Sequence, residues 1–303
     1  MARVLVTRRL PFPALDRLAA AHDVTVWEDD LPPSPERLRE LVADAEGLLC
    51  LLTDRVDAAL LDAAPRLRAI AVYAVGTDNV DHAAARARGI PVGNTPGVLT
   101  DATADLAFAL ILAAARRLAE GERAVRAGAW RTWEPAGWLG LELRGATLGI
   151  VGAGRIGRAV ARRAEGFGME VVTSRPAPLE ELLERSDVVS LHVPLTDATR
   201  HLIDAAALAR MKPGAILVNT ARGGVVDQRA VAQALRDGRL GAAALDVTDP
   251  EPLPPDDPLL DAPNLLVVPH IGSATHATRA RMADMAVDNL LAALAGEPMP
   301  HPA

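Results

Sequence analysis

A glycine-rich turn between a predicted strand and a predicted helix is the feature that most constrains this fold. The apolar run 148–151 leads directly into Gly152-Ala153-Gly154-Arg155-Ile156-Gly157, and an amphipathic helix is expected from Arg155 to about Phe167. In such a turn Gly152 permits the tight bend, Gly154 lets backbone approach a pyrophosphate, and Gly157 lets helix and strand pack closely. The helix N-terminus offers free amides to the phosphates. The turn therefore predicts a dinucleotide site that contains Gly152, Gly154, Arg155, Ile156 and Gly157.

The same alternation of apolar runs and helical patterns extends over most of the chain, which predicts parallel sheets. A first series has strand candidates at 3–7, 24–27, 47–52 and 69–74. A second series has them at 148–152, 170–174, 187–192, 215–220, 242–247 and 265–269. Long helices are expected at 100–118 and at about 274–295, and an irregular stretch with Trp130, Trp133 and Trp138 follows the first of them. The fold class is α/β, with two doubly wound parallel-sheet domains.

Length and composition exclude several classes of protein. The 303 residues are enough for two medium domains with buried cores. A formal net charge of −7 argues against nucleic acid or an acidic membrane as the main partner. No apolar stretch of about 18 residues and no signal peptide is present, so a cytoplasmic protein without membrane association is expected. Cys50 is the single cysteine, which excludes an internal disulfide and a cysteine-based metal cluster, and no metal is expected.

The strand after the glycine-rich turn bears on the choice of cofactor. An Asp or Glu about 20 residues beyond the turn normally binds the adenosine ribose hydroxyls. Here the strand ends in Thr173-Ser174-Arg175-Pro176, without an acid. A carboxylate would repel a 2′-phosphate, whereas the hydroxyl of Ser174 and the guanidinium of Arg175 would bind it. NADP(H) is therefore expected over NAD(H), unless Arg175 is only a solvated loop residue and the site is indifferent.

Three polar residues follow strands of the second series. Arg222 follows the strand 215–220, Glu251 lies in a Pro-rich loop after Asp246, and His270 ends the strand 265–269. Ligands of open α/β sheets bind beyond the carboxyl ends of the strands, so all three are expected at one crevice. Each of them singly fits a structural role, and their joint order at strand ends favours catalysis.

Together these motifs resemble the signature blocks of the D-2-hydroxyacid dehydrogenases, in order and over nearly the whole chain. The blocks are 75–81, 94–97, 152–157, 219–227, 246–247 with 251–252, and 269–275. Within that family, the segment 96–101 and the pair Trp130 and Trp133 are most similar to the glyoxylate/hydroxypyruvate reductases. The resemblance implies reduction of small 2-oxo acids to D-2-hydroxy acids by hydride transfer from NAD(P)H.

The resemblance also implies the roles of the catalytic and substrate-binding residues. Arg222 would bind the substrate carboxylate and polarise the 2-oxo group, and the backbone amides of Val75 and Gly76 would hold the carboxylate from the other side. His270 would be the general acid, and Glu251 would hydrogen-bond its imidazole and keep it protonated. A carboxylate at Glu251 argues against the formate dehydrogenase branch, whose reaction transfers no proton.

Further roles follow from the same resemblance. Asp246, Thr103 and Gly272 would contact the cofactor, and Trp133 would reach into the substrate site of a neighbouring subunit in a homodimer. The alternative is that the tryptophans are only interface core. His192 is interpreted as structural or cofactor-lining. The remaining histidines considered, His82, His201 and His276, are expected to be non-catalytic.

The resemblance places a Rossmann-type dinucleotide domain, residues 97–270, inside a smaller flavodoxin-like substrate domain formed by 1–96 and 271–303. The helix 100–118 and the last helix would bridge the two as a hinge. One departure from the family is a shortened segment after Arg175, where relatives insert a longer one. Alternatives stay open: a D-3-phosphoglycerate or D-lactate-type dehydrogenase of the same family, or an NAD(P)-sensing, corepressor-like interaction protein.

Overall fold

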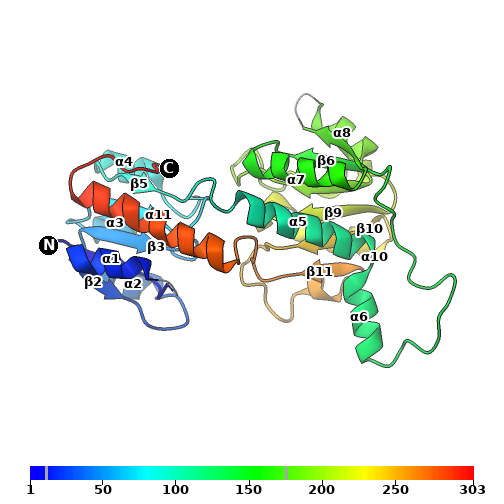
Figure 1. Cartoon of the computed structure of the whole chain (residues 1–303), viewed down its shortest axis with the longest axis horizontal. Coiled ribbons are helices and arrows are strands. Elements are labelled where there is room, and N and C mark those ends of the chain that lie inside the picture. The colour runs from blue at the N-terminus through cyan, green and yellow to red at the C-terminus, as the bar shows by residue number, and fades with distance from the viewer. Residues whose placement is uncertain (11–12, 175–176) are drawn as a thin grey trace. The chain divides into compact units, whose positions relative to one another are not determined.

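The computed structural model describes residues 1–10, 13–174 and 177–303 (Figure 1). The expectation for Arg175 falls outside the described residues. The chain divides into two compact units, with Met1–Leu99 and Ala274–Ala303 in unit 1 and Thr100–Ser273 in unit 2. Each unit is a parallel sheet with helices packed on its faces, so the predicted α/β class with two parallel sheets is confirmed.

Unit 1 contains, within the described residues, a five-stranded parallel sheet in the order β2-β1-β3-β4-β5. This is the order of flavodoxin-like sheets. The strands β3 and β4 are buried along their whole length, as expected for a parallel sheet covered on both faces. The elements are β1 (Arg3–Val6), α1 (Ala14–Ala21), β2 (Asp23–Val26), α2 (Pro35–Val42), β3 (Gly47–Cys50), α3 (Ala58–Asp62), β4 (Ala69–Val72), α4 (His82–Ala87), β5 (Val92–Gly93) and α11 (His276–Leu294).

Unit 2 contains a six-stranded parallel sheet in the order β11-β10-β9-β8-β6-β7, counted over the described residues. Its strand order reverses at β6, which lies between β7 and β8, and such a switch point is where dinucleotides bind. The elements are α5 (Thr100–Ala115), α6 (Leu118–Arg126), β6 (Thr147–Val151), α7 (Arg155–Gly166), β7 (Glu170–Thr173), α8 (Leu179–Arg185), β8 (Val188–Leu191), α9 (Ala205–Arg210), β9 (Ala215–Asn219), α10 (Gln228–Arg236), β10 (Leu240–Leu245) and β11 (Leu265–Val267), with 3-10 turns at Gly223–Val225 and Pro258–Asp261.

The shortened segment after Arg175 coincides with the edge of this sheet. In the six-stranded sheet of the described residues β7 is the edge strand, and the next element along the chain is the helix α8. The dinucleotide-binding order 3-2-1-4-5-6 has one more strand on that side. The departure noted in the sequence is therefore a sheet that ends one strand early on the side of β7.

The helix predicted over 100–118 is wrong at its end. The helix α5 stops at Ala115, Arg117 takes a left-handed conformation with φ 52°, and α6 begins at Leu118 where an irregular stretch was expected. No residue of α6 is buried, so this helix contributes no side chain to the core of unit 2. Pairs of Arg and Glu three or four residues apart, Arg117 with Glu120 and Arg126 with Glu122, support this helix instead.

A second correction concerns β10, which runs from Leu240 to Leu245 instead of over 242–247. Asp246 consequently lies in the loop just beyond the strand.

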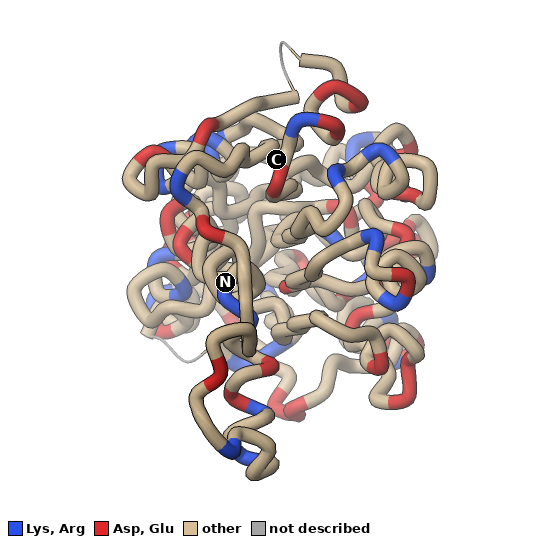
Figure 2. Tube along the Cα trace, turned by 90° about the vertical axis from the view of Figure 1, so that its right-hand side faces the viewer, with Lys and Arg blue, Asp and Glu red and all other residues tan. Residues whose placement is uncertain are grey.

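Charged residues of both signs are interspersed along the chain trace (Figure 2). None of the helices in the described ranges combines the length and the apolar character needed to cross a bilayer.

Candidate active site

Three loops at the carboxyl edge of the unit 2 sheet carry the predicted catalytic residues. They follow β9, β10 and β11, which are neighbours in the sheet. Backbone hydrogen bonds join them beyond the ends of the strands: the Asp246 amide donates to the Asn219 carbonyl at 2.9 Å, and the His270 amide donates to the Asp246 carbonyl at 2.9 Å. Arg222, Glu251 and His270 are thus brought to one edge, as parallel strands require.

His270 and Glu251 form a short side-chain pair. The imidazole Nδ1 lies 2.5 Å from Glu251 Oε1, and the two side chains are 25% and 32% exposed. Because an ionised carboxylate only accepts, the ring donates its Nδ1–H, and Nε2 is the nitrogen left to exchange a proton with a ligand. His270 also has φ 51°, a left-handed conformation that costs energy for a residue with a side chain. Such strain occurs where surrounding contacts impose it, often at functional sites.

The contacts that impose this conformation come from Asp246. Its carboxylate, 1% exposed, accepts from the Ile271 amide at 2.6 Å with Oδ1 and from the Gly272 amide at 2.9 Å with Oδ2. Burial raises the pKa of this carboxyl. The Thr103 hydroxyl donates to the Gly272 carbonyl at 3.2 Å. Thr103, Asp246 and Gly272, all predicted to contact the cofactor, therefore form one hydrogen-bonded group next to His270.

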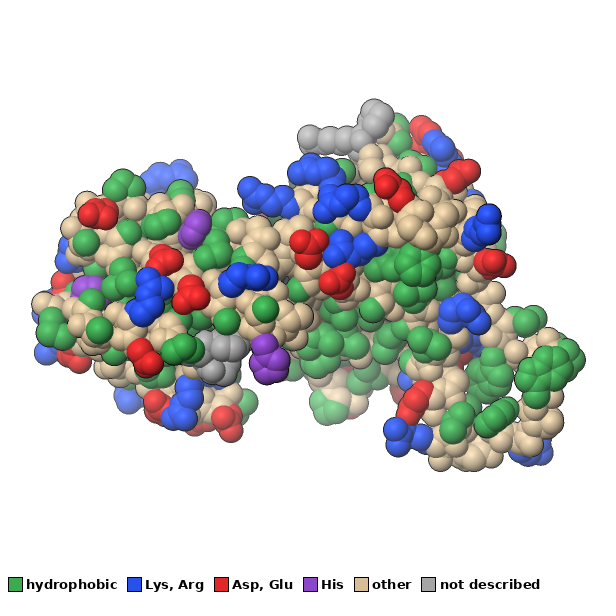
Figure 3. Space-filling view, in the orientation of Figure 1, with side chains coloured by type: hydrophobic (Ala, Val, Ile, Leu, Met, Phe, Trp, Pro, Cys, Tyr) green, Lys and Arg blue, Asp and Glu red, His purple; other side chains and the backbone are tan. Residues whose placement is uncertain are grey.

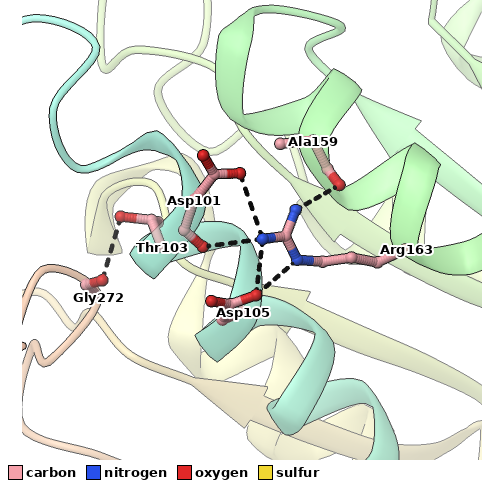
Figure 4. A network of polar contacts seen from close by, with 6 residues as sticks. All are labelled: Asp101, Thr103, Asp105, Ala159, Arg163 and Gly272. Carbon is pink, nitrogen blue, oxygen red and sulfur yellow. Dashed lines mark hydrogen bonds and ion pairs between the residues drawn. The ribbon is translucent and has the colours of Figure 1, made fainter.

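The start of α5 is in turn tied to the helix of the glycine-rich turn (Figure 4). Arg163 of α7 donates through Nε to Asp105 Oδ1 at 2.7 Å and through Nη2 to Asp101 Oδ1 at 3.3 Å, and its Nη1 donates to the Ala159 carbonyl at 2.9 Å. Asp101 and Asp105 flank Thr103 on the same helix. This one guanidinium therefore holds the segment that carries Thr103 against α7.

Arg222 is oriented by a buried asparagine. Asn219, fully buried at the end of β9, donates through Nδ2 to the Arg222 carbonyl at 2.9 Å and accepts the Ala221 amide with Oδ1 at 3.0 Å. Arg222 itself is half-buried and donates through Nη1 to the Ala221 carbonyl at 2.8 Å. The role of Asn219 was not predicted. The available signal was an uncharged amide at a strand end, three residues before the arginine.

The glycine-rich turn fits a pyrophosphate. Gly152 has φ 99°, and a Cβ there would lie 2.7 Å from the His192 carbonyl, while a Cβ on Gly157 would lie 2.2 Å from the Gly152 oxygen. A Cβ on Gly154, by contrast, would meet no atom within 4 Å, so the turn is open where a phosphate would approach. No side chain caps α7, which leaves its first amides to a ligand.

Two more residues border this turn. The Ser174 hydroxyl accepts from the Gly152 amide at 3.1 Å, so Ser174, which was predicted to bind a 2′-phosphate, lies beside the glycine-rich turn. His192 follows β8, and its amide donates to the Val151 carbonyl at 2.7 Å. Loss of solvation lowers the pKa of His192 to about 4, so the ring is neutral near pH 7 and its Nε2 shares a 2.9 Å hydrogen bond with Ser190.

Comparison with known proteins shows the family of this chain. The family model for the NAD binding domain of D-isomer specific 2-hydroxyacid dehydrogenases matches residues 108–272. The glyoxylate reductase of Korarchaeum cryptofilum (strain OPF8) is 51% identical over 314 residues, which cover 99% of this chain and 95% of that protein. The chain belongs to the D-isomer specific 2-hydroxyacid dehydrogenase family. The predicted family, and its glyoxylate reductase branch, are confirmed, and the dehydrogenase uses a nicotinamide dinucleotide.

Solved structures extend the comparison over the whole dehydrogenase. A protein of Thermus thermophilus is 54% identical, with a TM-score of 0.93 and 99% of both chains covered. The NADPH-dependent glyoxylate/hydroxypyruvate reductase of Sinorhizobium meliloti, solved with NADP and malonate, is 34% identical with a TM-score of 0.88, covering 100% of this chain and 96% of that one.

In unit 1 of the dehydrogenase, the turn Val75–Gly76 follows β4 at the carboxyl edge of the sheet. Within the described residues of unit 1, neither the Val75 amide nor the Gly76 amide donates to a backbone acceptor. Adjacent unpaired amides are suited to bind an anion. The Val75 carbonyl, in contrast, accepts from Asn94 Nδ2 at 2.7 Å.

The tryptophans singled out in the sequence lie in an exposed loop, away from the hydrogen bonds described above. Trp133 is 77% exposed, and Trp130, Trp138 and Leu139 are exposed in the same loop after α6. Apolar side chains gather on this part of the surface, over α6 and the loop, at the lower right of Figure 3. In unit 1, His82 Nε2 shares a 2.8 Å hydrogen bond with Thr77, and Cys50 is buried, which raises the pKa of its thiol.

Proposed function

We propose that this dehydrogenase reduces glyoxylate, hydroxypyruvate and similar small 2-oxo acids to D-2-hydroxy acids, with His270 as the proton donor. The observation that carries the proposal is the 2.5 Å pair of His270 and Glu251, on the loops after β11 and β10, with Arg222 on the loop after β9, the other neighbour of β10. Relatives that cover nearly the whole chain are glyoxylate reductases, which supports the substrate class.

In this proposal each protein group has a separate role in carbonyl reduction. Arg222, oriented by Asn219, binds the substrate carboxylate and stabilises the negative charge that grows on the 2-oxo oxygen. A bound reduced nicotinamide supplies a hydride for C2. His270 gives its Nε2 proton to that oxygen, and the Glu251 carboxylate stabilises the imidazolium before transfer. One hydride and one proton together convert the ketone or aldehyde to the alcohol.

The two units take different roles in the proposal. Unit 2 holds the dinucleotide through Gly152, Gly154, Gly157 and the first amides of α7 at Arg155 and Ile156. The contacts of Thr103, Asp246 and Gly272 with the cofactor remain predictions. Unit 1 is the substrate domain and supplies the amides of Val75 and Gly76 for the carboxylate. The predicted domain ranges, 1–96 with 271–303 and 97–270, are part of this proposal.

The proposal also includes NADP(H) as the preferred cofactor and a homodimer. Ser174 lies beside the Gly152 amide at the end of β7, where the acid typical of NAD sites is absent from the chain. The exposed apolar side chains on α6 and the loop after it are suited to cover the same surface of a second copy. Trp133 is the residue proposed to reach the neighbour's substrate site.

The test is the decay of reduced-nicotinamide absorbance with glyoxylate and hydroxypyruvate, run in parallel with phosphohydroxypyruvate and pyruvate. We expect rapid decay with the first two acids and slow decay with the others. A clear preference for phosphohydroxypyruvate or pyruvate would replace the substrate class by one of the alternative dehydrogenases. No decay with any 2-oxo acid, despite bound NADPH, would refute the enzyme in favour of a dinucleotide sensor.

A further inference from the structure

Two asparagines of unit 1, the buried Asn289 and the half-buried Asn94, connect α11 to the Val75–Gly76 turn. Asn289 of α11, fully buried, donates through Nδ2 to the Asn94 carbonyl at 3.0 Å and accepts the His301 amide with Oδ1 at 2.9 Å. Asn94 donates through its own Nδ2 to the Val75 carbonyl at 2.7 Å. A chain of hydrogen bonds therefore runs from α11 through the residue after β5 to the turn.

This chain of bonds has little freedom to rearrange. The Asn289 amide is wedged against β5, since a Cβ on Gly93 would lie 2.5 Å from its Nδ2. The Asn94 amide donates to the His301 carbonyl at 3.0 Å, so the segment around His301 is bonded to both asparagines. Only the Nδ2 end of a side-chain amide can donate, so the bond to the Val75 carbonyl fixes the Asn94 side chain with Nδ2 toward the turn. The Asn289 side chain is fixed by one donated and one accepted bond.

The direction of the turn amides follows from the planar peptide bond. In a trans peptide the carbonyl and the amide of one unit point in opposite directions. The Val75 carbonyl points at Asn94, so the Gly76 amide points away from it. Likewise the Ala74 carbonyl accepts from the Thr95 amide at 2.9 Å, so the Val75 amide points away from Thr95. Residues 94 and 95 together aim both amides outward from β5.

We propose that Asn94 and Asn289 are positioning residues for the substrate carboxylate, which they serve by aiming the Val75 and Gly76 amides. This inference rests on the proposed function, in which those two amides bind the carboxylate. Asn94 acts directly on the turn, and Asn289 acts through Asn94. Both side chains act on protein groups: Asn94 on the Val75 carbonyl, and Asn289 on the Asn94 carbonyl and the His301 amide.

The test uses Asn94→Ala and Asn94→Asp, because an aspartate turns a carboxylate oxygen toward the Val75 carbonyl. We expect KM for glyoxylate to rise at least about tenfold and kcat to fall less than about threefold. The dissociation constant of NADPH, measured by fluorescence titration, should stay unchanged. Asn289→Ala should give the same pattern, with a smaller rise in KM. The matched control is Leu290→Ala, which removes a buried side chain of α11 without touching the hydrogen-bond chain.

Two results would overturn the positioning role. One is a change in KM in the Asn94 variants that is no larger than the change in Leu290→Ala. For this comparison each variant is assayed at a temperature equally far below its own melting temperature. The other is an equal rise in the NADPH dissociation constant. If the wild-type protein reduces no 2-oxo acid, the proposed reaction is wrong. Calorimetric titration with oxalate then tests separately whether the Val75 and Gly76 amides bind a carboxylate. Oxalate binding that is lost in Asn94→Asp but kept in Leu290→Ala supports the role, and unchanged binding refutes it.

Discussion

The imidazole of His270 and the carboxylate of Glu251 lie 2.5 Å apart, although His270 belongs to the loop after β11 and Glu251 to the loop after β10. Asp246 fixes the backbone of His270. Its carbonyl accepts the His270 amide, and its carboxylate accepts the Ile271 and Gly272 amides. The ring therefore has a fixed position before any ligand binds, which is the preorganisation that proton transfer benefits from.

Replacing Glu251 by Gln should lower kcat/KM for glyoxylate about 100-fold at neutral pH, within the range typical of general acid–base catalysis. A neutral amide accepts the Nδ1–H more weakly than a carboxylate and does not stabilise positive charge on the ring, so proton transfer should slow while substrate binding changes little. The measurement is kcat and KM for glyoxylate at saturating NADPH, for the variant beside the wild type. A rise in KM with kcat unchanged would contradict this role for Glu251.

Replacing His270 by Ala should lower turnover by about three orders of magnitude, because the developing alkoxide loses its proton donor. The dissociation constant of NADPH should change less than about threefold. Stopped-flow reduction and fluorescence titration measure the two quantities. Loss of cofactor affinity as large as the loss in rate would assign His270 to cofactor binding instead.

Replacing Ser174 by Asp should reverse the cofactor preference. A carboxylate at the end of β7 repels a 2′-phosphate and accepts hydrogen bonds from ribose hydroxyls, so kcat/KM with NADPH should fall about 100-fold while that with NADH holds or rises. Ser174→Asn, which adds a side chain of the same size without the charge, tests whether any substitution at this position has the same effect. Equal losses with both cofactors would disprove a role for Ser174 in selecting the phosphate.

Replacing Trp133 by Ala should weaken self-association and lower kcat/KM, because its side chain is exposed in one copy and covered in the proposed dimer. Sedimentation velocity at several protein concentrations measures the first effect, and the glyoxylate assay measures the second. Leu31→Ala, which removes another exposed apolar side chain in unit 1, is the control. A wild-type protein that sediments as a monomer at every concentration would eliminate the dimer.

His192 should make the folded state sensitive to acid. Its pKa is about 4 in the folded protein and 6.5 in the unfolded chain, so between these values the unfolded state binds more protons. Lowering the pH through this window therefore reduces stability, by up to about 3 kcal/mol at about 1.4 kcal/mol per pKa unit. His192→Gln should flatten the dependence of unfolding free energy on pH between about 6.5 and 4. The exposed His276→Gln is the control, and an equally steep slope in His192→Gln would exclude His192 as its source.

The local sequence pattern was enough to predict most strands and helices, the glycine-rich turn and the catalytic residues. Strand and helix alternate because apolar runs and amphipathic patterns are properties of consecutive residues, and the turn Gly152–Gly157 is recognisable from its flanks alone. Arg222, Glu251 and His270 could be selected in advance because parallel strands place their carboxyl ends at one edge. The end of α5 was predicted too far along, since the left-handed Arg117 leaves no signature in an alanine-rich helix.

Tertiary structure alone decided the partners of the buried polar groups. Asp246 was identified as a site residue, yet its two bonds to the Ile271 and Gly272 amides depend on β10 and β11 lying side by side. Asn289 and Asn94 are 195 residues apart, and no periodicity indicates that one donates to the other. A side-chain amide can satisfy its hydrogen bonds with any neighbour of matching polarity, so its partner is set by which elements pack together.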